Sequence, residues 1–85
     1  MGFRVLYFAW VREAIGQDEE FVDPPREIAT VGALIGWLSA RGGGYAEAFR
    51  DPARIRVAVD QQFATHDAAI ASAREIALFP PVTGG

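Results

Sequence analysis

Apolar residues dominate the start of the chain and predict a strand, a short helix and a second strand. Residues 3–9 are rich in aromatic and β-branched types, over a length typical of a central strand buried on much of both faces. Residues 10–15 place apolar side chains on one side of a helix, and Gly16 is well placed to end it. Residues 19–22 are expected to pair antiparallel with the first strand, and Asp23 with two prolines stops them.

The clearest helical pattern begins at Thr30, whose side chain can cap a helix N-terminus. The spacing i, i+3, i+4 and i+7 produces one apolar stripe, made of Val31, Leu34, Ile35 and Leu38. Arg41 falls in the predicted last turn, and the glycines at 42–44 are expected to end the helix. Residues 45–50 are compatible with one more helical turn. The stripe predicts a helix that lies across a sheet.

The C-terminal half alternates in the manner of strands and completes an α+β pattern. Residues 55–59 predict a third strand with Arg56 outward, and a turn at 60–62 leads to a short fourth segment at 63–65. A connection anchored by Ile70 precedes the last strand, residues 75–79. The order predicts a β-grasp: a mixed sheet of four to five strands under one main helix, with its first and last strands parallel.

The last six residues, Pro-Pro-Val-Thr-Gly-Gly, differ from the rest of the chain. Proline lacks a backbone donor and fixes φ, so Pro80 and Pro81 end sheet pairing and keep the chain extended. Gly84 and Gly85 have no Cβ and allow a partner to approach the backbone closely. We therefore predict a β-grasp domain over residues 1–79 and a flexible tail over residues 80–85, whose carboxylate is the candidate reactive group.

Composition narrows the classes of function. The 85 residues suffice for one domain, and 51% of them are hydrophobic, which indicates a packed fold. No apolar run approaches the length of a membrane span, and we expect a cytoplasmic protein. A net charge of −3 disfavours nucleic acid as a partner. The absence of cysteine excludes a thiolate nucleophile, and the absence of lysine leaves no side-chain amine for an activated C-terminus to acylate.

The body of the domain offers no combination of side chains that indicates catalysis or a metal site. The single histidine, His66, is expected on a surface loop, because a general base needs a positioned nucleophile. Asp18, Glu19 and Glu20 are expected to be solvated, since a hard cation needs several more converging oxygens. Four large aromatic residues are expected mostly in the core: Phe8, Trp10, Trp37 and Phe79.

Three stretches match the motifs of one known family. Residues 5–16 have its opening strand and short helix, in which Phe-Ala precedes an Arg-Glu helix and a glycine. Residues 30–38 have its Thr-Val-x-x-Leu helix. Residues 75–85, the most specific stretch, resemble its ending, which is Glu-Val-Ala, an apolar pair and Pro-Pro-Val-Ser/Ala-Gly-Gly. Over nearly its whole length the chain thus resembles the small subunits of molybdopterin synthase, which are ubiquitin-like sulfur carriers.

The sequence departs from this family at two turns and one further position. Residues 60–62 are Asp-Gln-Gln where the family usually has an Asn-Gly-like turn, and residues 73–74 are Ala-Arg where it has Gly-Asp. Trp10 stands where a smaller or polar residue is common. These positions concern turns and surface rather than the ending, and they leave room for a specialised paralogue.

The resemblance implies that the chain acts as a tethered cosubstrate. An ATP-using partner similar to ubiquitin-activating enzymes would adenylate Gly85, and sulfur from a donor protein would replace AMP to give a thiocarboxylate. The large synthase subunit, with which the family commonly forms a heterotetramer, would supply the catalytic side chains. In its active site the thiocarboxylate would donate sulfur to a cyclic pyranopterin monophosphate, which becomes the dithiolene of molybdopterin. This chain would bind no cofactor, nucleic acid or membrane.

Partner contacts are expected at the end of the last strand and along the tail. A tail alone buries little area, so Phe79 and its neighbours on the sheet are hypothesised to form an apolar docking patch for the large subunit and the activating enzyme. The expected contact residues are Phe79, Pro80, Pro81, Val82 and Thr83.

Three alternatives remain open from the sequence. One is a sulfur carrier of another pathway: thiamin, cysteine, tRNA or a tungsten cofactor. A second is a protein modifier that becomes attached to lysines through Gly85. A third is a non-covalent β-grasp binding module in which the Gly-Gly ending is incidental.

Overall fold

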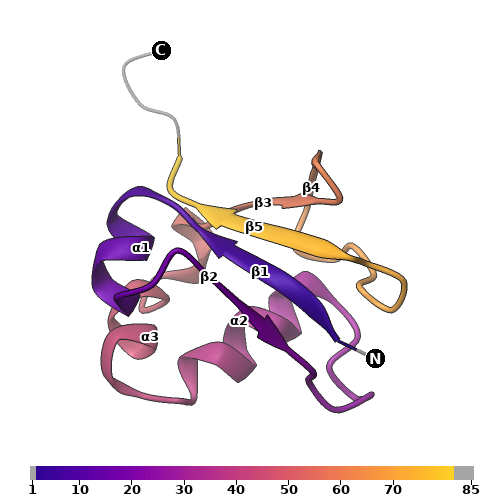
Figure 1. Cartoon of the computed structure of the whole chain (residues 1–85), viewed down its shortest axis with the longest axis horizontal. Coiled ribbons are helices and arrows are strands. Elements are labelled where there is room, and N and C mark those ends of the chain that lie inside the picture. The colour runs from indigo at the N-terminus through magenta and orange to yellow at the C-terminus, as the bar shows by residue number, and fades with distance from the viewer. Residues whose placement is uncertain (1, 82–85) are drawn as a thin grey trace.

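The first and last strands lie side by side and parallel inside a five-stranded mixed sheet (Figure 1). The computed structural model describes residues 2–81. The strands, in the order β2-β1-β5-β3-β4, are β1 (Phe3–Tyr7), β2 (Glu19–Val22), β3 (Arg56–Val59), β4 (Gln62–Ala64) and β5 (Glu75–Phe79). The helices are α1 (Ala9–Ile15), α2 (Val31–Ser39) and α3 (Gly43–Ala48), with a 3-10 turn, η1, at Pro52–Arg54.

The topology confirms the predicted α+β, ubiquitin-like β-grasp. Strand β1 pairs parallel with β5, with Val5 opposite Ile76, and antiparallel with β2, with Val5 opposite Glu20. Strand β3 pairs antiparallel with both β5 and β4. Both predicted pairings of the first strand are therefore confirmed, and the end of β5 is placed beside the end of β1.

Helix α2 forms as its sequence predicts. The Thr30 side chain accepts a hydrogen bond from the Ala33 N–H at 3.2 Å and caps the first turn. The predicted stripe is fully buried and belongs to the same core as the inward side chains of the sheet. The helix ends at Ser39, before Arg41, and two of the glycines expected to end it instead begin α3.

Helix α3 packs so closely on α1 that only glycine fits at its second position. A Cβ at Gly44 would collide with the carbonyl oxygen of Ala14, the residue that α1 turns toward α3. The close approach fixes the distance between the two short helices. It also gives a physical role to a glycine that the sequence assigns only to a helix end.

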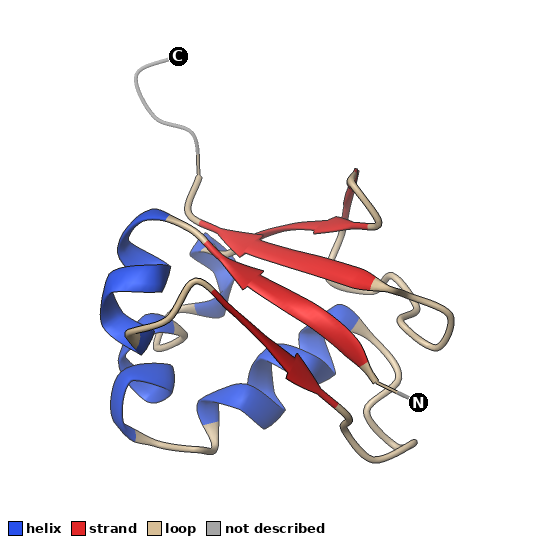
Figure 2. Cartoon of the chain, in the orientation of Figure 1, coloured by secondary structure: helices blue, strands red, loops and turns tan. Residues whose placement is uncertain are grey.

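Only one face of the sheet is covered, which corrects the expectation that the first strand is buried on much of both faces. In β1, Phe3, Val5 and Tyr7 are buried on the helix side, whereas Arg4 is exposed and Leu6 is half-buried. Figure 2 shows helices along one side of the sheet and no element across the other. The apolar second face of β1 is therefore open surface rather than core.

The turn between β3 and β4 forms without the Asn-Gly-like pair that is usual in the family the chain resembles. Asp60 and Gln61 both have positive φ, 49° and 71°, as a two-residue hairpin turn requires. The Asp60 carboxylate accepts hydrogen bonds from the backbone N–H groups of Arg74 and Glu75, each at 2.9 Å. The departures at 60–62 and 73–74 thus meet in space, and the aspartate ties the hairpin to the start of β5.

Within residues 2–81, no helix combines the length and the apolar character needed to cross a bilayer.

Candidate docking surface

The parallel pairing of β1 and β5 determines where Pro80 and Pro81 lie relative to the sheet. Phe8, the first residue after β1, donates its backbone N–H to the Leu78 carbonyl at 3.3 Å, so the two strands end together. Phe79 is the last residue of β5, and Pro80 and Pro81 follow it without joining a strand. The structure thus brings together three of the predicted contact residues, all half-buried. The other predicted site residues, Val82, Thr83, Gly84 and Gly85, lie outside the described residues.

An apolar patch covers the open face of the sheet next to these prolines. Strand register aligns Leu6, Ala77 and Ala58 across β1, β5 and β3, and it sets Phe63 of β4 opposite Ala58. The patch, which we define as Leu6, Ala58, Phe63, Ala77 and Phe79, therefore runs across four strands. Phe63 is exposed, Leu6, Ala58 and Phe79 are half-buried, and Ala77 is buried among them. Contiguous apolar side chains open to solvent often mark an interaction site.

Phe63 and Phe79 form the prominent part of the apolar patch. Their ring centroids are 6.0 Å apart with the planes tilted by 56°, and Phe63 is 87% exposed. Phe63 gains little from folding, because most of its ring still faces water. Burying such a side chain against a partner is worth about 1.5–3 kcal/mol before the costs of association.

A shallow depression lies beside these rings, between β3, β4 and the end of β5. Arg56, Phe63, Phe79 and Pro81 contribute to its lining, together with Val57 and Ala64. Arg56 is the strand partner of Phe79 and is its charged neighbour on the open face. The sequence identifies Arg56 only as an outward residue and assigns Phe63 no function. Strand alternation could have assigned both residues to the outward face, but their position beside Phe79 depends on the pairing of β3 with β4 and β5.

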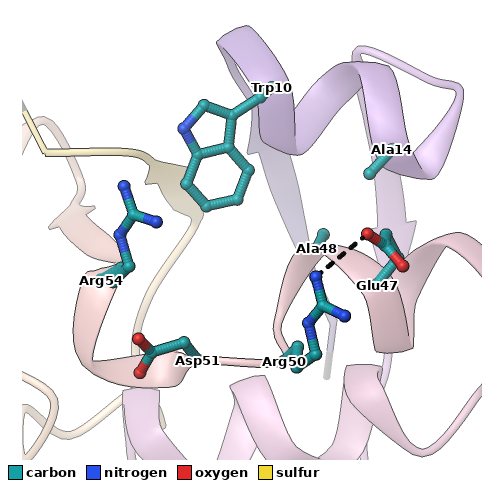
Figure 3. A pocket seen from close by; sticks show the side chains of 7 residues that line it. All are labelled: Trp10, Ala14, Glu47, Ala48, Arg50, Asp51 and Arg54. Atoms are coloured by element: carbon teal, nitrogen blue, oxygen red, sulfur yellow. Dashed lines mark hydrogen bonds and ion pairs between the residues drawn. The ribbon is translucent and has the colours of Figure 1, made fainter.

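A second groove lies between α1 and the segment from α3 to η1 (Figure 3). Its lining residues are Trp10, Ala14, Glu47, Ala48, Arg50, Asp51 and Arg54. Figure 3 shows the Arg54 guanidinium turned toward the Trp10 indole, and its central carbon lies 5.7 Å from the ring centroid. Glu47 and Arg50 form an ion pair at 3.4 Å.

The expectation that four aromatic residues are mostly core is wrong for Phe8 and Trp10, which are 45% and 38% exposed. Both lie where β1 passes into α1, a helix that fully buries only Val11. Trp37 and Phe79 are half-buried, and Trp37 packs against the core at its edge, with the Arg41 guanidinium 4.9 Å from its ring centroid. Phe8 and Trp10 therefore add exposed aromatic surface at the end of β1, beside the end of β5.

Glu20 has a structural role that the sequence does not reveal. It accepts hydrogen bonds from the hydroxyls of Tyr7 at 2.8 Å and Tyr45 at 2.6 Å, and from Arg41 at 3.0 Å. Burial raises the pKa of Glu20, but these hydrogen bonds outweigh it and hold the pKa below its ordinary value. Burial and the bond to Glu20 raise the pKa of Tyr7. Glu20 thus joins β2 to β1, α3 and the end of α2, rather than being solvated as expected.

The single histidine and the potential metal-ligating side chains are the groups on the body of the domain that bear on chemistry. His66 is half-buried, and its Nε2 lies 2.7 Å from the Ile55 carbonyl oxygen, so the ring is engaged with the backbone. No group of three or more potential metal-ligating side chains occurs in residues 2–81. The surface features that remain are the apolar patch, the groove and the exit of residues 80–85.

Comparison with known proteins gives a consistent result. The model of the ThiS family matches residues 5–85. The molybdopterin synthase sulfur carrier subunit of Escherichia coli is 38% identical over 82 residues, which cover 96% of this chain and 98% of the relative. The Dictyostelium discoideum protein of the same name is 36% identical over 85 residues, which cover 98% and 95%.

Solved structures share the fold. The crystal structure of SAMP1 from Haloferax volcanii superposes with a TM-score of 0.72 at 29% identity and covers 100% of both chains. A crystal structure of H. volcanii small archaeal modifier protein 1 superposes with a TM-score of 0.69 at 27% identity and covers 95% of this chain and 98% of its own.

Proposed function

The chain belongs to the ThiS family, and from this premise we propose that it is the sulfur carrier subunit of a molybdopterin synthase. The observation that carries the proposal is its identity to proteins of that name, 38% in the E. coli case, over nearly the full length of both chains. A large synthase subunit is then its principal partner.

The proposed reactive group is the carboxylate of Gly85. An α-carboxylate has a pKa of about 3.3–3.7, so it is ionised and a poor electrophile at neutral pH. Attack of this carboxylate on the α-phosphate of ATP, on an adenylyltransferase, releases pyrophosphate and leaves an acyl adenylate. A persulfide on a donor protein then displaces AMP to give an acyl disulfide, and a second thiol attacks the donor's sulfur, which releases the thiocarboxylate and leaves a disulfide on the donor side. The soft sulfur is delivered to a cyclic pyranopterin monophosphate held by the large subunit.

The apolar patch supplies the docking area that an extended segment lacks. Phe63 and Phe79 stand beside the exit of residues 80–85, so one partner surface can cover the rings while it receives the glycines. Anchoring the domain makes the terminal group effectively intramolecular for the partner's active site. This arrangement rests on the predicted division into a β-grasp domain over residues 1–79 and a flexible tail over residues 80–85, which stays a prediction.

The deciding experiment is the intact mass of the protein purified from its native host during molybdenum cofactor synthesis. We expect a population heavier by the exchange of one oxygen for one sulfur, located on the peptide that contains Gly85. A plain carboxylate in every molecule under these conditions would contradict the carrier function. Reconstitution with the large subunit and the pterin precursor then separates molybdopterin synthesis from other sulfur pathways.

One observation favours a second function. The similarity to H. volcanii small archaeal modifier protein 1 includes 27% identity, so attachment of this chain to other proteins through Gly85 is a candidate activity. The chain contains no lysine, which prevents self-attachment at a side-chain amine. Immunoprecipitation under denaturing conditions tests this candidate, because it predicts a ladder of conjugates with isopeptide bonds to Gly85.

A further inference from the structure

Arg56 presents an electrostatic problem for any protein that covers the apolar patch. Its side chain lies in the same depression as Phe63, Phe79 and Pro81, and strand register sets it directly across from Phe79. A partner that seals the rings from water must therefore also remove water from the guanidinium. Burying an unpaired charge is costly, and a guanidinium does not lose its proton to avoid that cost.

Nothing within the described part of the chain compensates this charge. Arg4, Arg41 and Arg50 each form an ion pair with a glutamate, whereas within residues 2–81 Arg56 forms none. Its five N–H donors are therefore open to a group outside the domain. A planar guanidinium matches a carboxylate in a bidentate geometry better than any other protein acceptor.

Arg54 repeats the arrangement two residues earlier. Within residues 2–81 it also lacks an ion pair, and it lies against the exposed indole of Trp10 in the groove between α1 and η1. The contact with Trp10 restricts the guanidinium without neutralising it. Arg54 and Arg56 flank Ile55 at the start of β3, the strand end that pairs with the end of β5. Two unneutralised charges thus lie at the point where residues 80–85 leave the domain.

We propose that Arg56, assisted by Arg54, recognises carboxylate groups on the protein that receives residues 80–85, so that this chain docks on an apolar surface with an acidic rim. The inference rests on the proposed function, because it takes the receiving protein to cover the apolar patch. It adds the chemistry of that surface: an apolar centre for Phe63 and Phe79, and aspartate or glutamate opposite the arginines. Burial of the two rings contributes most of the binding free energy, and the charge pairs determine which partner protein is bound.

The test is Arg56→Leu, because only an acidic rim predicts that this variant binds more weakly than the wild type. Leucine removes the charge and enlarges the apolar patch. On an acidic rim, binding to the organism's own large synthase subunit should weaken by about three- to tenfold at low ionic strength, with a smaller loss at high salt. On a purely apolar surface, the same variant should bind as tightly as the wild type or more tightly.

Titration calorimetry measures the affinity for the large subunit, and two further variants are compared with Arg56→Leu. Arg54→Gln should also weaken binding, but by less than Arg56→Leu does. The reason is that Arg54 is exposed, so water screens the charge that the substitution removes. Arg26→Leu is the matched control: it removes an exposed arginine that lines a separate depression with Pro24 and Pro25, and it should leave the affinity unchanged. Equal affinity of wild type and Arg56→Leu at low salt would overturn the inference.

The outcomes separate this inference from the proposed function. If the terminal thiocarboxylate is found and the wild type binds the large subunit, an unchanged Arg56→Leu affinity overturns the acidic rim alone. If the wild type does not bind the large subunit, the proposed function fails and the inference fails with it. A charge-swap pair, Arg56→Glu with an arginine at the partner's identified acidic residue, should restore binding that each single change weakens.

Discussion

Phe63 and Phe79 lie with ring centroids 6.0 Å apart on the face of the sheet that no helix covers. They come from β4 and β5, which do not pair directly, and β3 lies between them. The contact depends on the two-residue turn at Asp60 and Gln61, which sets Phe63 opposite Ala58. A tight hairpin that precedes the last strand in the sequence therefore completes the surface at the end of that strand.

Phe79→Asp should weaken the complex with the large synthase subunit by at least about tenfold and leave the fold intact. The reason is that an aspartate places a charge in the centre of the apolar patch, where interface energy tends to concentrate. Affinity is measured by titration calorimetry and folding by thermal unfolding. Phe21→Asp is the control, because Phe21 is 67% exposed on the edge strand β2. Unchanged affinity in Phe79→Asp, or an equal loss in Phe21→Asp, would remove the docking patch.

Phe63→Ala should separate affinity from stability. The side chain is 87% exposed, so its removal should change the free energy of unfolding by no more than about 0.5 kcal/mol. In the complex the ring becomes buried, and its loss should cost about 1–2 kcal/mol of binding free energy. Chemical denaturation and calorimetry on the same sample give both values. A large loss of stability with unchanged affinity would assign Phe63 to the fold instead.

Glu20→Gln should destabilise the fold by about 1–2 kcal/mol, because the amide cannot accept from Tyr7, Tyr45 and Arg41 as the carboxylate does. Glu19→Gln is the control: Glu19 is half-exposed and lies 3.9 Å from Arg4, so little should change. Urea denaturation at neutral pH measures both.

The same pair of variants has a defined pH dependence. Hydrogen bonds hold the pKa of Glu20 below its ordinary value in the folded state, so the ionised form stabilises the fold. That contribution is fully present above the ordinary glutamate pKa of about 4.3 and is lost as the pH falls through the lowered value. The stability gap between wild type and Glu20→Gln should be constant from neutral pH to mildly acidic pH and narrow in stronger acid. A gap that widens on acidification would contradict the assignment.

Local patterns predict most of the fold because each element is specified by its own residues. The Thr30 cap and the stripe from Val31 to Leu38 form α2 as expected, and residues 19–22 and 75–79 form strands with the predicted bounds. The start of α3 is not predictable in this way. Gly43 and Gly44 are poor helix formers, and α3 begins there because Gly44 must pass close to Ala14, a contact made only in the folded chain.

The sequence predicts only those residues of the candidate site that are neighbours in the chain. The sequence identifies Phe79 and the prolines, because they form one continuous motif. Phe63 and Arg56 join them through strand register, which depends on the turn at Asp60. Glu20 looks like a solvated residue of an acidic turn, since its partners Tyr7, Tyr45 and Arg41 come from three distant segments. Long-range pairing is what the sequence leaves undetermined.

Gly44→Ala and Gly36→Ala should shift stability in opposite directions. The added Cβ at position 44 collides with the Ala14 carbonyl and must push α3 away from α1, so the melting temperature should fall. At position 36, inside α2, nothing lies within 4 Å of an added Cβ. Alanine there should stabilise the helix by up to about 1 kcal/mol, because it lowers the entropy of the unfolded chain. Equal melting temperatures for the two variants would contradict the close approach of α1 and α3.

Deleting Gly84 and Gly85 should abolish sulfur transfer while preserving docking. The apolar patch and the two arginines belong to the domain that ends at Phe79, so the truncated protein should still bind the large subunit, with an affinity reduced by the contacts of the missing segment. The terminal carboxylate would then stand on Thr83, whose branched side chain hinders entry into a narrow channel. Competition measures this outcome: excess truncated protein should inhibit molybdopterin synthesis by the wild-type carrier. Full activity of the truncated protein itself would contradict the proposal that the terminal Gly85 is the reactive group.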